Sequence, residues 1–220
     1  MKIYDLTWPV LEESIVPEYL SPATLTPIWH HSIQGISIQL LCTATHLGTH
    51  MDAPYHFIKD GATIDQIPLQ RCIGQGIVID IPCQEPRAIT QPEIAAAAEK
   101  AGGVRAGDLV LIRTSWDVRY GTSDYLTWPF LDLGAVDWLV ECGMALFGAD
   151  TQGVERPLAL REAGEFAFPI HHRLLGMGIP IVEGLAHLSL VAGRRVMVAV
   201  VPLLLVGGDG SPVRAIAWDQ

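Results

Sequence analysis

Positive charge is scarce in this sequence. The chain has 220 residues, of which 17% are charged, and 14 Lys and Arg stand against 24 Asp and Glu, for a net charge of −10. Proteins that bind nucleic acid or an anionic membrane usually present a basic surface to it. The acidic balance therefore argues against both as partners, and an apolar content of 50% indicates a globular rather than a disordered protein.

Paired cysteines and long hydrophobic runs are also missing. None of the four cysteines belongs to a C-x-x-C pair, and nothing suggests a secreted disulfide scaffold, so we expect buried thiols. The longest apolar run, residues 196–206, is too short to span a bilayer and contains Pro202. The first ten residues lack the apolar segment of a signal peptide. These absences predict a soluble, cytoplasmic protein.

Histidine, in contrast, is concentrated in residues 46–56, which hold three of the eight histidines. The ionisable residues of this stretch all have even numbers: His46, His50, Asp52 and His56. Side chains two residues apart point the same way on an extended backbone, while Gly48 and Pro54 disfavour a helix. We therefore expect a strand that runs into a loop, with the four side chains on one face and room for an ion or substrate above Gly48.

This group of side chains predicts a metal site. Two imidazoles and a carboxylate, from His46, His50 and Asp52, suit Zn or Mn better than Ca or Mg. Three protein ligands leave an open position on a catalytic metal. The alternative is a loop of surface histidines.

Hydrophobic patterns predict strands that alternate with helices. We expect strands within residues 2–7, 36–40, 74–81, 108–115, 144–148 and 179–182, and two more within 195–218 joined by the turn at 207–210. Helices are expected at 91–101, where Thr90 and Glu93 can form a capping box, and at 132–142. This order is typical of an α/β protein with parallel strands. No repeat or linker is visible, so we expect one domain over residues 1–220.

The histidine-rich stretch also resembles a known family. HLGTHMDAPYH is similar to the H-x-G-T-H-x-D-x-P-x-H signature of the metal-dependent cyclase family, which includes bacterial kynurenine formamidase and isatin hydrolase. Weaker similarities begin at Asp5-Leu6-Thr7, which resembles the family's D-L-[ST] opening, and extend to about Leu188. The resemblance implies a swivelling β/β/α fold, with a parallel sheet, a second sheet packed on it and helices outside. It also implies a homodimer.

The resemblance extends to a second group of ligands. Residues 171–175 and 181–185 are similar to the family's H-x-x-L-L…E-[GN]-[LI] pattern, which places His171 and Glu183 on its remaining ligand positions. In the formamidases, Asp52 and Glu183 would bridge two zinc ions, with His46 and His50 on the first and His171 on the second. Isatin hydrolases tend to carry Gln at the Glu183 position and to bind one Mn, so Glu183 favours two ions. Judged without the resemblance, a Glu after an apolar strand is more often exposed than ligating.

His56 is the candidate catalytic residue. Amide hydrolysis requires a proton for the leaving nitrogen, and an imidazole titrates near neutral pH. The family's catalytic His occupies the same last position of the motif. The alternatives for His56 are a fourth metal ligand and an orienting role.

The N-terminal segment is the expected substrate-binding region. Residues 8–31 are irregular and carry Trp8, Trp29, His30 and His31, which we consider as pocket, core or surface residues. Kynurenine formamidases carry a Trp followed by Pro-Gly-Asp in this region, and residues 15–20 have neither. Further along, Asp150 matches the Asp of the family's G-x-D-x-x-S pattern, but Gly153 stands in the Ser position. We interpret Asp150 as a structural or supporting residue rather than a ligand.

The sequence therefore predicts a metal-dependent hydrolase of a C–N amide bond, acting through metal-activated water on a small molecule. An arylformamidase of the N-formylkynurenine type is the leading hypothesis. A cyclic amide hydrolase of the isatin type, a lactone hydrolase and a non-catalytic metal-binding protein are the alternatives. A cupin is disfavoured because the chain lacks H-x-H with a nearby Glu.

Overall fold

The core of the molecule is a closed β-barrel. The computed structural model describes residues 1–10, 20–162, 164–165 and 167–219. Within them, one sheet has the strand order β1-β12-β11-β5-β7-β9-β10-β4, and a further pairing of β12 with β4 closes seven of these strands into a ring. The strands are Ile3–Asp5 (β1), His50–Asp52 (β4), Ile73–Asp80 (β5), Leu109–Arg113 (β7), Leu146–Ala149 (β9), Ile181–Glu183 (β10), Arg195–Pro202 (β11) and Gly210–Trp218 (β12).

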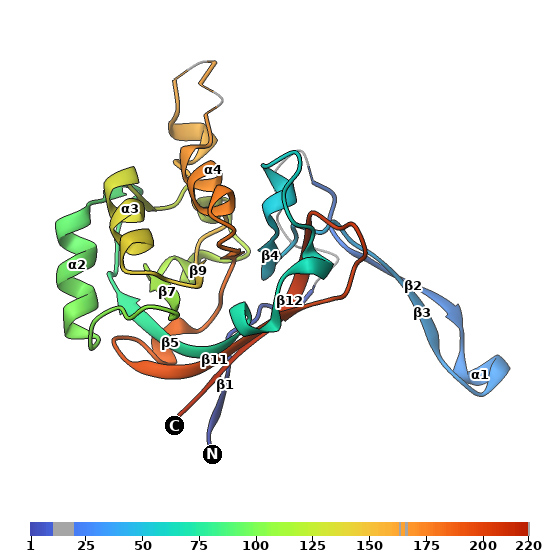
Figure 1. Ribbon diagram of the computed structural model, residues 1–220. Coiled ribbons are helices and arrows are strands. Elements are labelled where there is room, and N and C mark those ends of the chain that lie inside the picture. Colours follow the sequence, from blue (N-terminus) through green and yellow to red (C-terminus); the bar gives the residue numbers. More distant parts are fainter. Residues whose placement is uncertain (11–19, 163, 166, 220) are drawn as a thin grey trace.

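One half of the barrel is parallel and carries the helices. β5, β7, β9 and β10 pair in parallel, and α2 (Gln91–Lys100), α3 (Leu133–Glu141) and α4 (Pro169–Gly176) cover their outer side (Figure 1). At the start of α2, Glu93 Oε2 accepts the N–H of Thr90 at 2.9 Å, so the predicted capping box is present. A short parallel pair, Ala88–Ile89 (β6) with Phe130–Leu131 (β8), precedes α2 and α3. The helix α4 follows no pattern that was predicted from the sequence.

Side-chain alternation along the parallel strands produces two cores. On β5, Ile77 and Ile79 pack toward the helices, while Val78 packs toward the barrel interior. β7 repeats the pattern, because Val110 and Ile112 join the helix-side core and Leu109 and Leu111 join the interior. Runs of apolar residues without polar alternation are the sequence signature of strands buried on both faces.

The second half of the barrel is antiparallel. β11 pairs with β5 and β12, and β4 pairs with both β10 and β12. The α/β class is confirmed, and so are the predicted strands and helices of residues 73–149 and 181–218. The expected second sheet is not separate, because its strands continue the parallel sheet and close the barrel.

A two-stranded arm extends away from the barrel (Figure 1). It consists of β2 (Thr24–Trp29), α1 (His31–Gln34) and β3 (Ile38–Cys42), and every residue of these three elements is exposed. The alternating strand predicted near residues 36–40 exists, but it belongs to this arm rather than to the core sheet. The strand β2 was not predicted.

The cysteine prediction is only partly right. Cys72 and Cys83 are buried, but Cys142 is half-buried and Cys42 is exposed on the arm, and all four are free thiols. Throughout the described ranges, every helix is too short or too polar to cross a membrane.

Candidate metal centre

Two neighbouring strands place most of the predicted ligands. β4 and β10 pair antiparallel, with Glu183 opposite His50 and Ile181 opposite Asp52. The intervening Met51 and Val182 point into the barrel core, so the side chains of His50, Asp52 and Glu183 project from the other face. These three polar side chains are nevertheless buried.

Glycine allows the two halves of the site to approach each other. Gly184 has a φ of +65°, and a Cβ there would lie 2.5 Å from the carbonyl oxygen of Gly48. The hydroxyl of Thr49 donates to the carbonyl of Gly184 at 2.6 Å, and Nδ1 of His50 lies 2.9 Å from the carbonyl of Gly48. Thr49 therefore fastens the motif to the residue that follows β10, while the carbonyl of Gly48 helps to orient the ring of His50.

The predicted ligands of the first metal come together, but not for the reason given by the sequence. Only His50 and Asp52 lie on a strand, while His46 lies in a turn and His56 ends the short 3-10 helix Pro54–His56. The expected strand that runs into a loop is present, but the strand covers only His50–Asp52, so one extended backbone does not account for the placement of His46 and His56. The turn instead brings His46 Nδ1 to 2.7 Å from Asp52 Oδ1.

Asp52 lies at the centre of two groups of candidate ligands. One group contains His46, His50 and Asp52, and the other contains Asp52, His171 and Glu183. Nε2 of His50 lies 3.5 Å from Asp52 Oδ1 and 3.5 Å from Glu183 Oε2. Nε2 of His171 lies 3.7 Å from Asp52 Oδ2 and 3.5 Å from Glu183 Oε1.

These residues fit a metal ion. Ligand atoms at about 2.0–2.1 Å from a tetrahedral ion lie about 3.3 Å from one another, close to the spacings found here. Oδ2 of Asp52 is buried and makes no hydrogen bond with any described residue. An unpaired buried carboxylate oxygen is costly, and a cation beside it would remove that cost. The donors are imidazole nitrogens and carboxylate oxygens, which is the chemistry of Zn and Mn sites.

His171 is supported from behind by Glu155, which the sequence analysis missed. Oε1 of Glu155 lies 3.1 Å from His171 Nδ1 and accepts the backbone N–H of His171 at 2.8 Å. Metal-binding histidines usually donate their second N–H to such a carboxylate, which fixes the tautomer and turns Nε2 toward the ion. Glu155 follows no recognisable local pattern.

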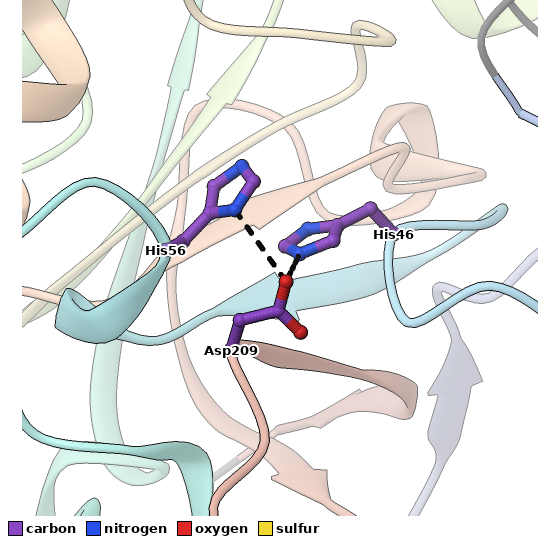
Figure 2. Close-up of side chains that lie close together, drawn as sticks. All are labelled: His46, His56 and Asp209. Atoms are coloured by element: carbon purple, nitrogen blue, oxygen red, sulfur yellow. Dashed lines mark hydrogen bonds and ion pairs between the residues drawn. The ribbon is translucent and has the colours of Figure 1, made fainter. Parts of the chain in front are cut away.

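Asp209 was also missed. It lies in the turn before β12, and its Oδ2 lies 3.1 Å from His46 Nε2 and 3.8 Å from His56 Nδ1 (Figure 2). His46, His56 and Asp209 form a third group of possible ligands. The only signal in the sequence is a lone acid among the glycines of residues 207–210.

The electrostatics of the metal-free site favour the protonated form of His46 and His171 but not of His56. Burial disfavours the charged form of His46, but Asp52 and Asp209 outweigh it and raise its pKa to about 9. In the same way, burial is outweighed at His171 by Glu155, Glu183 and Asp52, which raise its pKa to about 10. Burial lowers the pKa of His56. His56 is therefore neutral at pH 7, while His46 and His171 must lose protons before they bind a metal.

Asp150, His172 and His187 differ in their surroundings. Asp150 accepts hydrogen bonds from Thr114 and Ser115 and has the structural position expected. His172 is exposed, and the backbone N–H of His187 donates to Asp117 at 3.0 Å.

The N-terminal aromatic candidates separate into two groups. Trp8 stacks on Tyr120 at 4.1 Å, and its backbone N–H donates to the hydroxyl of Thr49 at 2.9 Å, beside the metal motif. Trp29, His30 and His31 lie on the exposed arm instead, so core packing of Trp29 is excluded by its 44% exposure. The departure at residues 15–19 lies outside the described residues.

Comparison with known proteins agrees with this geometry. The model of the Cyclase family matches residues 4–156. The chain belongs to the Cyclase family. It is 33% identical over 189 residues to a kynurenine formamidase of Salinibacter ruber, which covers 84% of this chain and 81% of that protein.

Solved structures of similar proteins have the same fold. Isatin hydrolase A of Ralstonia solanacearum superposes with a TM-score of 0.89 at 26% identity, over 100% of this chain and 92% of the other. A structure described as a potential metal-dependent hydrolase with cyclase activity has a TM-score of 0.79 at 29% identity, with coverage of 100% and 98%. The family match ends before His171 and Glu183, so their place in the site rests on the geometry described above.

Proposed function

We propose that this Cyclase-family chain is a metal-dependent hydrolase of a C–N amide bond, and that its substrate is an N-formylated arylamine of the N-formylkynurenine type. The observation that carries the proposal is Asp52, which belongs to two groups of candidate ligands and whose buried Oδ2 makes no hydrogen bond with any described residue. The similarity to kynurenine formamidase over most of both chains supports the formamide.

We further propose two ions, Zn or Mn, that share Asp52. His46 and His50 would hold the first ion, His171 the second, and Glu183 lies within reach of both His50 and His171. When bound, such ions supply a nucleophilic hydroxide near neutral pH and polarise the carbonyl that it attacks. The two carboxylates offset part of the charge of the ions in a site where all of these ligands except His46 are buried.

In this proposal, His56 is the residue that transfers a proton to the leaving nitrogen. Its ring stacks on His46 with centroids 3.9 Å apart, and it lies outside both ligand groups that contain Asp52. Burial lowers its pKa, so it is neutral at pH 7 and can accept a proton before passing it to the leaving nitrogen.

The arm supports the homodimer implied by the family resemblance. Residues 24–42 contain no Asp, Glu, Lys or Arg, although the whole chain carries a net charge of −10. Ile36, Ile38 and Leu40 repeat with the period of a half-buried strand, yet they are 46%, 42% and 55% exposed. Two copies of this negatively charged chain can meet through such an uncharged apolar surface without repulsion between their charges. β1 and β12 pair with each other in the same eight-stranded sheet, and this continuity of the sheet supports one domain over residues 1–220.

The decisive experiment is a side-by-side assay. Purified protein is stripped of metal, reloaded with Zn or Mn, and assayed with N-formylkynurenine, isatin and a simple lactone. We expect the formamide to be the best substrate. Faster turnover of isatin would reassign the chain to cyclic amides, and metal binding without turnover of any of them would contradict the proposed hydrolase.

A further inference from the structure

One carboxylate oxygen faces two histidines with different expected roles. Oδ2 of Asp209 lies 3.1 Å from Nε2 of His46 and 3.8 Å from Nδ1 of His56 (Figure 2). The two imidazole rings stack at an interplanar angle of 27°. Asp209 therefore contacts both a candidate metal ligand and the candidate proton carrier.

The position of Asp209 is built into the barrel closure. In the β12–β4 ladder, Gly210 pairs with Asp52, so the preceding residue lies beside the metal-binding strand. The carbonyl of Asp209 accepts the backbone N–H of Ala53 at 2.9 Å, and its Oδ1 accepts the hydroxyl of Thr45 at 3.0 Å. Both its backbone and its side chain are thus held in place, although the side chain is 41% exposed.

Gly210 explains how the histidine ring approaches this turn. A Cβ at Gly210 would lie 2.6 Å from Cε1 of His46 and 3.0 Å from its Nε2. Any larger residue would displace the ring and separate Nε2 from Asp209. The glycine and the aspartate therefore act together on His46.

The arrangement at Asp209 parallels the one behind His171. There, Glu155 holds Nδ1 and leaves Nε2 directed at Asp52 and Glu183. At His46 the nitrogens are reversed, because Asp209 faces Nε2 and Nδ1 is directed at Asp52. Each half of the site thus has a histidine held between a supporting carboxylate and the shared Asp52.

We propose that Asp209 is a positioning residue for the reaction. It accepts the Nε2–H of His46, so that Nδ1 is presented toward Asp52 and the metal, and it keeps the ring of His56 stacked beside that ligand. The part that concerns His56 rests on the proposed hydrolase function. The part that concerns His46 requires only that the site binds a metal.

The test compares Asp209→Ala with Asp65→Ala. Asp65 holds the same β11–β12 loop from outside the site, since its Oδ1 accepts the N–H of Gly207 at 3.0 Å. Zinc affinity is measured by competition with a chelating dye, the cobalt-substituted site by its absorption spectrum, and kcat and KM with N-formylkynurenine. Loss of a carboxylate behind a metal-binding histidine typically weakens metal binding or activity by about 10–100-fold.

We expect Asp209→Ala to weaken zinc binding, shift the cobalt spectrum and lower kcat by about 10–100-fold, with a smaller change in KM. Asp209→Glu should restore part of the loss, and Asp65→Ala should leave the zinc affinity and cobalt spectrum unchanged. Unaltered zinc affinity and kcat in Asp209→Ala would overturn the proposal. An equal loss in Asp65→Ala would also overturn it, since loop integrity would then explain both. If the wild type hydrolyses nothing, the proposed function fails, and the zinc and cobalt measurements alone decide the role of Asp209 at His46.

Discussion

The metal end of the barrel buries polar side chains, whereas the β2–β3 arm exposes apolar ones. At the barrel end, His50 and Asp52 are 2% and 1% exposed despite their polarity. On the arm, Leu40 and Leu41 are 55% and 50% exposed despite being apolar. Each region departs from the usual distribution of polar and apolar residues. The first departure supports the proposed metal centre, and the second supports the proposed dimer. Buried acids and imidazoles match a cation, while an exposed apolar hairpin matches another protein surface.

Asp52→Ala should have the largest effect, because it removes the one ligand common to both groups. We expect the loss of bound metal and a fall in activity of at least about a thousandfold, since hydroxide would no longer be available near neutral pH. Metal content by plasma emission spectrometry and the formamide assay measure the two effects. Asp80→Ala is the control, because this acid pairs with Arg113 at 2.6 Å outside the site. Retention of both metals in Asp52→Ala would refute its central position.

His56→Ala should separate catalysis from metal binding. We expect the metals to remain and turnover to fall by about 10²–10⁴-fold, the usual contribution of a general acid–base residue. Steady-state kinetics and metal analysis of the same preparation provide the comparison. If His56→Ala lost metal as severely as Asp52→Ala, His56 would be reassigned as a ligand.

Raising the pH should destabilise the metal-free protein but strengthen its binding of metal. The pKa values of His46 and His171 are raised above their ordinary value to about 9 and about 10 in the metal-free protein. Their contribution to stability is complete below about pH 6.5 and is lost as the pH rises through these values. Metal affinity should instead increase over this range, because fewer protons compete for the ligands.

Thermal melts of the metal-free protein from pH 6 to 10, together with zinc titrations at each pH, measure both trends. We expect a falling melting temperature and a rising affinity. A melting temperature that rises with pH over this range would show that the two histidines are already neutral in the metal-free protein.

Leu40→Asp should have the smallest effect on the barrel and a clear effect on assembly. The substitution puts a charge on the arm without touching the core, so the stability of the barrel should change by less than about 0.5 kcal/mol. Light scattering after size exclusion should show a monomer in place of a dimer. Leu190→Asp is the matched control, since Leu190 is 52% exposed on the barrel side of the molecule and should leave the dimer intact. A dimer in both variants would place the interface elsewhere.

The sequence located the metal ligands better than it explained their geometry. His50 and Asp52 have the predicted strand alternation, but His46 and His56 reach the site from a turn and a short helix. Residue spacing reports which chemistry is present in a stretch, whereas a turn's path depends on contacts such as that of Gly48 with Gly184. Those contacts join residues more than a hundred positions apart.

The supporting carboxylates could not be predicted for the same reason. Glu155 and Asp209 lie in loops with no periodic pattern, and each acquires its role through contact with another element, which is α4 for Glu155 and β4 for Asp209. For the arm, the local structure was predicted but its surroundings were not. Its alternation correctly predicted strand β3, but alternation does not say whether the apolar face meets the same chain or another one.

The pairing of β12 with β4 has a consequence for the order of events during folding. Asp52 lies opposite Gly210 in this ladder, so two segments that are far apart in the sequence must pair before one wall of the site exists. Pairings between distant segments form more slowly than local contacts, because the chain between them must first be ordered. We therefore expect the candidate ligands to take up their final arrangement late in folding, when the barrel closes.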